Sequence, residues 1–467
     1  MGIKIISKKI FCYFGKRFFF FIIANLILTV TLFSQVREKW VARYNGPGNG
    51  EDTASELAID DSGNVYVTGS SKGAEGTYQF ATIKYDNDGN ELWVARFEGP
   101  NSQCNNYANA LALDSSGNVY VAGTGVGEWS GYDCVVVKYN SSGEEQWVGR
   151  YDGLIYQYDE ATDVALDSNG NVYITGKSQA AGTFPYNYDF VTIKYNKDGV
   201  AQWIKRYNGE GNWDDVSKAI TIDSSDNVYV TGYSFGYSTG PDYVTIKYNT
   251  NGIEQWVKRY NTPGYDTDDV PEDIAIDSFG NVYVTGYQTG EGHFYAIFGA
   301  TIKYNGNGEQ QWVTTFNQYY HMYDIALNDN GNIYVTGLRG TVSNGIITIK
   351  LDENGIPQWS RVYEYVIGSL SGHAYLTLDI SENIYVLGIG NSASEFTIIK
   401  YNSAGIEQWK TSYKNEGMGA AIAGIALDAN NNVYISGTCS YTLIKSDFIT
   451  IKYIQNVAVN REVWMNY

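Results

Sequence analysis

The sequence is poor in cysteine, in proline and in runs of helix-forming residues. It holds 4 Cys and 7 Pro among 467 residues, but 51 Gly and 15% aromatic residues. So few cysteines exclude a fold that depends on a disulfide framework. Richness in glycine and aromatics without Ala/Leu/Glu/Lys runs favours an all-β protein.

Motifs of several enzyme classes are also absent. The Walker loop, H-E-x-x-H and C-x-x-C do not occur. The glycine-rich stretch Gly123–Gly127 follows a strand pattern but opens no helix, so it predicts a flexible loop and no dinucleotide site.

Positive charge is concentrated at the N-terminus. Five basic residues precede an apolar run and a small residue, in the order of a secretory signal: Lys4, Lys8, Lys9, Lys16 and Arg17, then Phe18–Phe33 and Ser34. We predict that residues 1–34 are a signal peptide and that the protein is secreted or at the cell surface. The alternative to a cleaved signal is that this segment stays as an uncleaved membrane anchor. No other contact with a membrane is expected. The remainder has 27 Lys and Arg against 51 Asp and Glu, a net charge of −24, which excludes nucleic acid as a partner.

One strand pattern recurs eight times at a spacing of about 52 residues. It reads N-V/I-Y-V/I-x-G and closes at Gly69, Gly123, Gly176, Gly232, Gly286, Gly337, Gly388 and Gly437. The unit Asp163–Tyr207 contains four alternating strands, at about 163–167, 171–176, 190–195 and 201–207, joined by two tight turns and one long loop. Eight such units predict a β-propeller.

A tryptophan strand also recurs eight times, but out of phase with the other three. Its first copy, residues 38–45, precedes the first unit, whereas the last unit lacks one. We therefore predict an eight-bladed β-propeller of four-stranded antiparallel blades over residues 35–454, with a short tail at 455–467. The strand around Trp40 must lie beside that around Ile451 and complete the last blade. We interpret the tryptophans as blade-to-blade packing.

Within each unit, the sequence resembles the SBBP family of β-propeller repeats of secreted bacterial proteins. The resemblance rests on D-S-x-G-N-V-Y-V-T-G, D-F/Y-V-T-I-K-Y-N and acidic loop ends such as Asp159–Asp163, and it covers about residues 36–453. It implies the propeller fold and a surface or secreted scaffold role. The spacing D-x-x-G-x-x-x-W, as in Asp86–Trp93, is similar to the tryptophan motif of quinoprotein dehydrogenases, which implies pyrroloquinoline quinone and calcium. Most units carry Asn for this Asp and adjacent cysteines are missing, so no cofactor is predicted.

Two of the four loops in each unit are long and differ from unit to unit, and both lie on one face of the disc. Function usually resides on such loops. Aromatic residues there, with acidic neighbours, suit a sugar ring or a protein surface, while simple packing of the loops is the alternative. The predicted binding residues are Trp129, Tyr132, Tyr188, Trp213, Tyr237, Tyr265, His293, Tyr295 and Tyr319.

Acidic residues recur at one position of the first strand, which is the innermost strand of a propeller. They are expected to line the channel mouth, bonded to neighbouring backbone or, alternatively, holding Ca²⁺: Glu56, Asp163, Asp273 and Asp324. His321 and Asp324 are the candidates for acid–base catalysis.

We expect a monomeric, non-catalytic binding or scaffold propeller that recognises an extracellular glycan or protein through its variable loop face. One alternative is an extracellular polysaccharide-degrading hydrolase or lyase with its site at the channel mouth, and another is a quinoprotein-like dehydrogenase. An axial pocket with several titratable groups would favour an enzyme, and shallow aromatic patches a binding platform. A disulfide between Cys104 and Cys134, on one face of adjoining units, is a further hypothesis.

Overall fold

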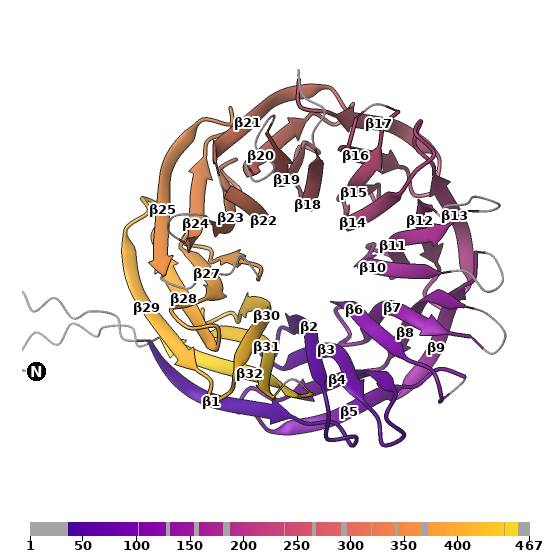
Figure 1. Ribbon diagram of the computed structural model, residues 1–467, viewed down its shortest axis with the longest axis vertical. Helices are drawn as coiled ribbons and strands as arrows, with labels where there is room; N and C mark the ends of the chain where they lie inside the picture. The colour runs from indigo at the N-terminus through magenta and orange to yellow at the C-terminus, as the bar shows by residue number, and fades with distance from the viewer. Residues whose placement is uncertain are drawn as a thin grey trace, which may run out of the picture. The chain divides into compact units, whose positions relative to one another are not determined.

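The computed structural model describes residues 36–455, apart from 101, 128–130, 154–157, 181–186, 238, 264–267, 291–296, 319, 341–343, 366–371 and 443. Its strands form eight four-stranded antiparallel sheets arranged as the blades of a ring (Figure 1). The predicted eight-bladed propeller is thus confirmed. The predicted signal peptide lies outside the described residues. Within those residues, no helix is long and apolar enough to cross a membrane.

The strands are named by their position in the blade, from the centre outwards. The inner strands of blades 1 to 8 are β2 (Asp52–Ile59), β6 (Asn106–Leu113), β10 (Asp159–Leu166), β14 (Asp215–Ile222), β18 (Asp269–Ile276), β22 (Tyr320–Leu327), β26 (Tyr375–Leu378) and β30 (Gly419–Leu427). The second strands are β3 (Val65–Lys72), β7 (Val119–Val126), β11 (Val172–Gln179), β15 (Val228–Phe235), β19 (Val282–Thr289), β23 (Ile333–Arg339), β27 (Ile384–Ile389) and β31 (Val433–Thr442).

The third strands are β4 (Tyr78–Tyr85), β8 (Tyr132–Tyr139), β12 (Tyr188–Tyr195), β16 (Pro241–Tyr248), β20 (Ile297–Tyr304), β24 (Asn344–Leu351), β28 (Glu395–Tyr401) and β32 (Lys445–Gln455). The outer strands are β5 (Glu91–Phe97), β9 (Glu145–Tyr151), β13 (Ala201–Tyr207), β17 (Glu254–Tyr260), β21 (Gln310–Gln318), β25 (Pro357–Tyr365), β29 (Glu407–Lys414) and, for blade 8, β1 (Val36–Tyr44). In blade 3 the inner strand begins four residues before the predicted start at Asp163, because the buried Asp159 accepts backbone N–H bonds from Gly153 and Gln179 and joins the sheet.

The first strand of the chain closes the ring. β1 pairs antiparallel with β32, and Val41 lies opposite Ile451. Blade 8 therefore consists of β30, β31, β32 and β1, so the two ends of the folded chain meet within one sheet. This pairing removes the open edge that an incomplete last blade would leave.

Seven of the eight contacts between adjacent blades include a bond from the outer-strand tryptophan to a backbone carbonyl. Its indole N–H donates, over 3.0 to 3.2 Å, to a backbone carbonyl in the turn between the third and outer strands of the next blade. The pairs are Trp40–Asn87, Trp93–Ser141, Trp147–Lys197, Trp203–Thr250, Trp256–Gly306, Trp312–Glu353 and Trp359–Ser403. The tryptophans are therefore interblade contacts, as interpreted from the sequence.

A repeated lysine of the third strand reinforces this tryptophan bond. Lys84, for example, donates to the same Ser141 carbonyl as Trp93, and its ammonium lies 4.8 Å from the centre of the Tyr66 ring. Tyr66 in turn donates to Asp60 in the turn of its own blade. The repeated Asp, Tyr, Lys and Trp thus form one structural network that uses hydrogen bonds and cation–π contact.

The spacing D-x-x-G-x-x-x-W, which is similar to the motif of quinoprotein dehydrogenases, forms the turn between the third and outer strands. The side chain of Asp86 accepts backbone N–H bonds from Asp88 and Asn90, and an Asn side-chain oxygen does the same in other blades, which explains the exchange of Asp and Asn. Gly89 has a φ of 86°, and a Cβ added there would lie 2.6 Å from the Trp40 ring. Glycine is therefore required by both backbone conformation and interblade contact.

At the closure of the ring a side chain replaces the missing turn carbonyl. The chain ends meet where blade 8 would have its turn between third and outer strands. Gln455 Oε1 accepts from Trp409 Nε1 at 3.1 Å and from Lys400 Nζ at 2.9 Å. Gln455 therefore completes the contact between blades 7 and 8.

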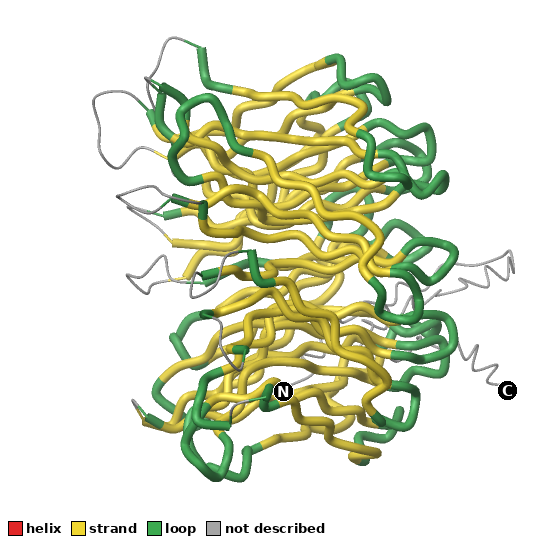
Figure 2. Tube along the Cα trace, turned by 90° about the vertical axis from the view of Figure 1, so that its right-hand side faces the viewer, coloured by secondary structure: helices red, strands yellow, loops and turns green. Residues whose placement is uncertain are grey.

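The two ends of the blades carry different loops (Figure 2). Because the strands of a blade alternate in direction, the turns after the inner and third strands lie at one end, here called the turn face. These turns are short and hydrogen-bonded within four or five residues. The longer connections lie at the other end, here called the loop face, which positions the candidate site.

We predict that Gln455→Ala lowers the free energy of unfolding by about 1–3 kcal/mol, because Trp409 and Lys400 lose their common acceptor. Gln408→Ala is the matched control, since Gln408 is exposed and donates only to Ile406 of its own turn. Urea denaturation followed by tryptophan fluorescence measures both. Equal stabilities of the two variants would contradict the closing role of Gln455.

Candidate functional site

A β-bulge in the inner strands makes two consecutive residues face the centre of the ring. In seven blades the pairing of the inner strand with the second strand shifts register. In β2 the shift lies between Ala54 and Glu56, so Ser55, the fourth residue of the strand, forms the bulge. The residues of other blades that correspond to Ser55 and Glu56 are called the fourth and fifth positions. An unbroken strand would point the fourth and fifth residues to opposite sides. The bulge brings both into the lining of one axial cavity.

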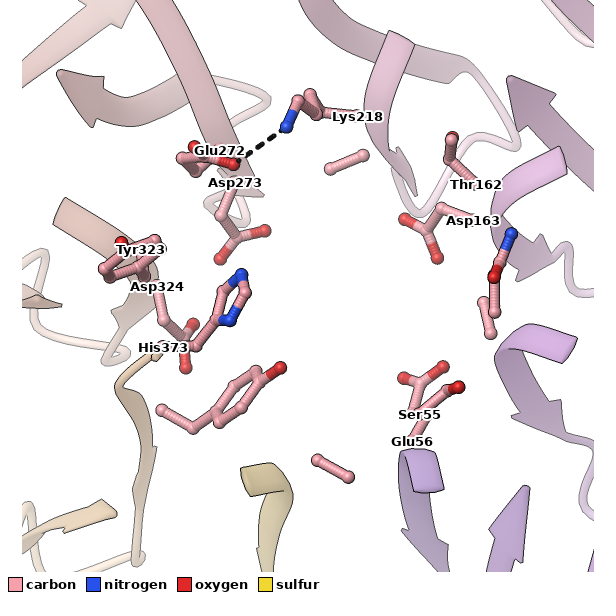
Figure 3. A pocket seen from close by; sticks show the side chains of 15 residues that line it. Ser55, Glu56, Thr162, Asp163, Lys218, Glu272, Asp273, Tyr323, Asp324 and His373 are labelled. Carbon is pink, nitrogen blue, oxygen red and sulfur yellow. Dashed lines mark hydrogen bonds and ion pairs between the residues drawn. The ribbon is translucent and has the colours of Figure 1, made fainter. Parts of the chain in front are cut away.

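The cavity has a volume of about 370 Å³ and is lined by all the inner strands. Its acidic residues are the four carboxylates predicted from the sequence, Glu56, Asp163, Asp273 and Asp324, together with Glu272 (Figure 3). The sequence did not place the fourth-position residues in the cavity, because the alternation of apolar and polar residues along a strand does not reveal a bulge. They are Ser55, Asn109, Thr162, Lys218, Glu272, Tyr323 and Ala423.

Each predicted carboxylate bonds to the backbone of the next blade. The N–H of Leu111 donates to Glu56 at 2.6 Å, that of Ile220 to Asp163 at 2.8 Å, that of Ile325 to Asp273 at 3.0 Å and that of Leu376 to Asp324 at 2.7 Å. These bonds fasten neighbouring inner strands around the axis. They also hold the carboxyl groups against the cavity wall.

Burial inside the ring shifts the acidity of these groups. Burial, with the added negative charge of Asp163, raises the pKa of Glu56 to about 8 despite the bond from Leu111. Burial likewise raises the pKa of Asp163 to about 7. The pKa values of Asp273 and Asp324 are also raised by burial, and the charge of Asp324 raises that of Asp273 further. Such shifts arise because the side chains, although partly accessible, face only the cavity.

A chain of polar contacts borders the same cavity. Glu272 lies 3.3 Å from Lys218 Nζ and 3.1 Å from His321 Nε2, and the Tyr323 hydroxyl lies 3.2 Å from His321 Nδ1. Although burial would raise the pKa of Glu272, the bond with His321 and the charge of Lys218 lower it. The His373 ring packs on Tyr323, and burial lowers the pKa of His373. His321 and Asp324 thus belong to one region of the molecule.

Five tyrosines form an arc on the loop face of blades 1 to 3. Ring centres lie 5.4 Å apart for Tyr78 and Tyr107, 5.3 Å for Tyr132 and Tyr158, and 6.1 Å for Tyr158 and Tyr188. Burial, and then the charge of Tyr132, raises the pKa of Tyr107. All five are half-buried. We call this set the tyrosine arc.

The tyrosine arc forms because its members occupy corresponding positions in successive repeats. Its members alternate between the start of a third strand and the start of an inner strand, so each ring meets one from the adjoining strand or blade. Tyr132 and Tyr188 are among the binding residues predicted from the sequence, whereas Tyr78 and Tyr107 were not predicted. A tyrosine as first residue of the third strand in three consecutive blades is the signal that identifies it: Tyr78, Tyr132 and Tyr188.

Lysine and carboxylate groups accompany the arc. Lys177 Nζ lies 5.3 Å and 5.1 Å from the ring centres of Tyr158 and Tyr188, and it pairs with Glu160 at 3.0 Å. The Tyr158 hydroxyl donates to Glu160 at 3.3 Å. The arc therefore combines apolar ring surface with hydrogen-bonding groups.

Of the remaining predicted binding residues, the two that the structure describes are not part of the arc. Trp213 and Tyr237 lie on the loop face of blade 4 with 54% and 83% of their surface exposed. Five others lie outside the described residues: Trp129, Tyr265, His293, Tyr295 and Tyr319.

Acidic groups close enough to share a metal ion occur once among the residues that the structure describes. Oxygen atoms of Asp133, Asp152 and Asp159 lie within 4.8 Å of one another, and Asp133 also pairs with Arg150 at 2.7 Å. Within the described part of the chain, the cavity carboxylates form no such group.

The hypothesis of a Cys104–Cys134 disulfide is wrong for this structure, in which both cysteines are free thiols, as is Cys439. Cys134 is buried in β8, where its side chain packs in the apolar core shared by blades 2 and 3. Cys104 lies in the connection before β6 and is only half-buried.

The raised acidities predict a pH-dependent stability. The folded state holds protons on Glu56 and Asp163 that the unfolded chain loses at about pH 4. This stabilisation is complete below that pH and is fully lost once pH has risen through the folded pKa values of about 7 and 8, so the free energy of unfolding should fall between about pH 4 and pH 8. In the Glu56→Gln/Asp163→Asn variant, urea denaturation should show a shallower slope. Glu145→Gln, on an exposed outer strand, should keep the original slope, and three equal slopes would contradict the assignment.

Comparison with known proteins agrees with the ring. A curated protein from Acanthamoeba polyphaga mimivirus, described as an uncharacterized WD repeat-containing protein, is 23% identical over 457 residues, 78% of this chain and 31% of that protein. The regulatory protein FlaEY of Caulobacter vibrioides is 35% identical over 148 residues, 27% of this chain and 15% of that protein. The chain thus spans less than a third of the length of either relative.

A solved structure shares the fold alone. Chaetomium thermophilum Sqt1, solved bound to the N-terminus of a ribosomal protein, superposes with a TM-score of 0.54 at 8% identity, over 89% of this chain and 99% of that one. The pattern of the SBBP β-propeller repeat matches residues 39–75, 149–182, 202–238 and 255–292. These four matches, set in a ring of eight like blades, confirm that the chain contains repeats similar to the SBBP β-propeller repeat.

Proposed function

We propose that this protein is an exported, non-catalytic binding propeller that recognises a glycan through the loop face of blades 1 to 3. The observation that carries the proposal is the tyrosine arc, in which half-buried rings across three blades contact one another as a pair, Tyr78 with Tyr107, and as a triplet, Tyr132, Tyr158 and Tyr188. Sugar rings are bound by apolar contact with aromatic faces and by hydrogen bonds from nearby polar groups. The arc offers both.

The net negative charge of the protein limits the classes of ligand that it can bind. An excess of acidic residues repels polyanions, so a nucleic acid or a strongly anionic polysaccharide is disfavoured. A neutral or amino-bearing glycan has no such penalty. The basic and apolar N-terminal segment supports export to the compartment where such glycans occur.

A second candidate function, a polysaccharide-degrading enzyme, is favoured by the axial cavity. Glu272 orients His321, whose other ring nitrogen meets the Tyr323 hydroxyl. A carboxylate that orients an imidazole beside a hydroxyl is the arrangement used to activate that hydroxyl as a base or acid. Several titratable groups in one cavity are the feature expected of an enzyme.

The tyrosine arc can be tested by substitution. Tyr158→Ala removes the ring that touches both Tyr132 and Tyr188, so we expect at least about a tenfold loss of glycan affinity, equal to about 1.4 kcal/mol. Tyr237→Ala is the matched control, because Tyr237 is an exposed tyrosine on the same face in blade 4. A glycan array followed by titration calorimetry of the hits measures both. Equal losses in the two variants would contradict the assignment to the arc.

Release of reducing sugar separates the two candidate functions. For a binding propeller, we expect no release from the glycans that the array identifies. Release by the unaltered protein that is lost in Tyr323→Phe, with glycan affinity retained, would replace the binding proposal by the enzymatic one. The Phe variant keeps the ring packing on His321 and removes only the hydroxyl.

A further inference from the structure

A set of three polar residues recurs between neighbouring blades on the loop face. It consists of the second residue of a third strand, the residue that follows the outer strand of the same blade, and the first residue of the next inner strand. The set between blades 2 and 3, here called site 2/3, is Asp133, Asp152 and Asp159, and the set between blades 3 and 4, here called site 3/4, is Asp189, Asn208 and Asp215.

The two sites are held by the same backbone bond. The N–H of Gly153 donates to Oδ2 of Asp159 at 2.7 Å, and the N–H of Gly209 donates to Oδ2 of Asp215 at 2.7 Å. Both aspartates are buried at the start of an inner strand. Sites 2/3 and 3/4 therefore share one local framework, and what one of them shows applies to the position of the other.

At site 2/3 three carboxylates converge. One oxygen atom each of Asp133, Asp152 and Asp159 lies within 4.8 Å of the other two. Ca²⁺ binds oxygen at about 2.3–2.6 Å, so two ligands on opposite sides of the ion lie about 4.6–5.2 Å apart. A single Ca²⁺ ion can thus span these oxygen atoms. Arg150 pairs with Asp133 alone, at 2.7 Å, so the set keeps an excess of negative charge.

At site 3/4 two buried carboxylate oxygens lack a hydrogen-bond partner. They are Oδ1 of Asp189 and Oδ1 of Asp215, whose residues are 7% and 1% exposed. Oδ2 of each is bonded, that of Asp189 to Arg206 and that of Asp215 to Gly209. The Ser234 hydroxyl lies near Asp215 Oδ1 but forms no hydrogen bond of normal geometry with it. Anionic oxygens enclosed by protein without a donor are costly, and they point to a bound cation.

The strands that carry these two oxygens are bonded to each other. The N–H of Tyr188 donates to Asp214 Oδ1 at 3.2 Å, and Asn187 Nδ2 donates to the carbonyl of Asn212 at 2.8 Å. The residues directly before Asp189 and Asp215 thus meet across the interface between blades 3 and 4. Together with the shared framework, this places the two unpartnered oxygens where site 2/3 has its three carboxylates.

We propose that Ca²⁺ binds on the loop face between blades 2 and 3 and between blades 3 and 4, with the side-chain oxygens of sites 2/3 and 3/4 as its ligands. Carboxylate and amide oxygens are the ligands that Ca²⁺ prefers, whereas transition metals favour imidazole or thiolate, which neither set contains. Water completes the coordination beside Asp152 and Asn208, which are exposed. Site 2/3 binds more tightly, because site 3/4 has an amide in place of one carboxylate.

The two sites adjoin the tyrosine arc. Tyr132, Tyr158 and Tyr188 each directly precede an aspartate of one of the sites. A bound cation fixes the backbone from which these three rings project, so Ca²⁺ should strengthen glycan binding by the arc. This consequence rests on the proposed function, whereas the cation sites themselves do not.

The test is titration calorimetry of Ca²⁺ and of Mg²⁺ into the whole protein after EDTA has been added and dialysed away. We expect Ca²⁺ to bind with a Kd of about 1 mM or lower, and Mg²⁺ more weakly because it gives up its water molecules reluctantly. Asp152→Asn should weaken site 2/3 by about tenfold or more, and folding does not depend on this exposed side chain. Asn208→Asp gives site 3/4 its third carboxylate and should tighten it by a similar factor.

Asp215→Asn separates a cation ligand from a structural residue. The variant keeps an oxygen to accept from Gly209 and places an amide donor next to the unpartnered oxygen of Asp189. The melting temperature should therefore rise in EDTA, and the further rise that Ca²⁺ gives through site 3/4 should be lost. A purely structural aspartate would instead give a lower melting temperature in EDTA. Asp329→Asn is the matched control, because Asp329 is exposed on the turn face.

The outcomes distinguish the cation sites from the proposed function. Absence of Ca²⁺ binding, or binding that none of the three site variants alters, would overturn the cation sites, and glycan binding that persists in EDTA would then leave the tyrosine arc standing. Equal affinity for Ca²⁺ and Mg²⁺ would overturn the choice of Ca²⁺. Ca²⁺ binding that the variants alter as expected, without recognition of any glycan, would support the cation sites and contradict the proposed function.

Discussion

The bond from each outer-strand tryptophan to a turn carbonyl of the next blade determines this structure. It fixes the distance and angle between blades, and a lysine from the third strand converges on the same carbonyl. Eight such contacts close the ring only if the last is made, and there Gln455 takes the place of the carbonyl that the chain ends cannot supply. The Asp, Asn and Gly of the turns, and the repeated Tyr and Lys, all serve this one contact.

Closure of the ring also creates the axial cavity. Eight inner strands converge on the axis, and the bulges of seven of them turn two residues each towards it. Polar side chains that would reach solvent in a single sheet are thereby collected into one small volume. Low dielectric and mutual repulsion then shift their acidities, which is why Glu56 and Asp163 titrate far from the usual range of carboxyl groups.

The sequence was sufficient to predict the fold, because eight copies of one pattern and an out-of-phase Trp40 strand allow one closed arrangement. It also placed Glu56 and Asp324 at the axis by register alone. It could not reveal Lys218 and Glu272 beside them, since strand alternation assigns these residues to the opposite side and only the bulge reverses them. The tyrosine arc was found in part, because Tyr158 joins its neighbours through contact between blades that no single unit displays.

The pairing of Val36 with Gln455 has a consequence for how the propeller is displayed. The folded chain enters and leaves at adjacent points on the turn face, whereas the tyrosine arc lies on the loop face at the other end of the blades. An attachment at either end of the folded chain would hold the propeller by its turn face. The loop face would then remain unobstructed whichever terminus carried the attachment.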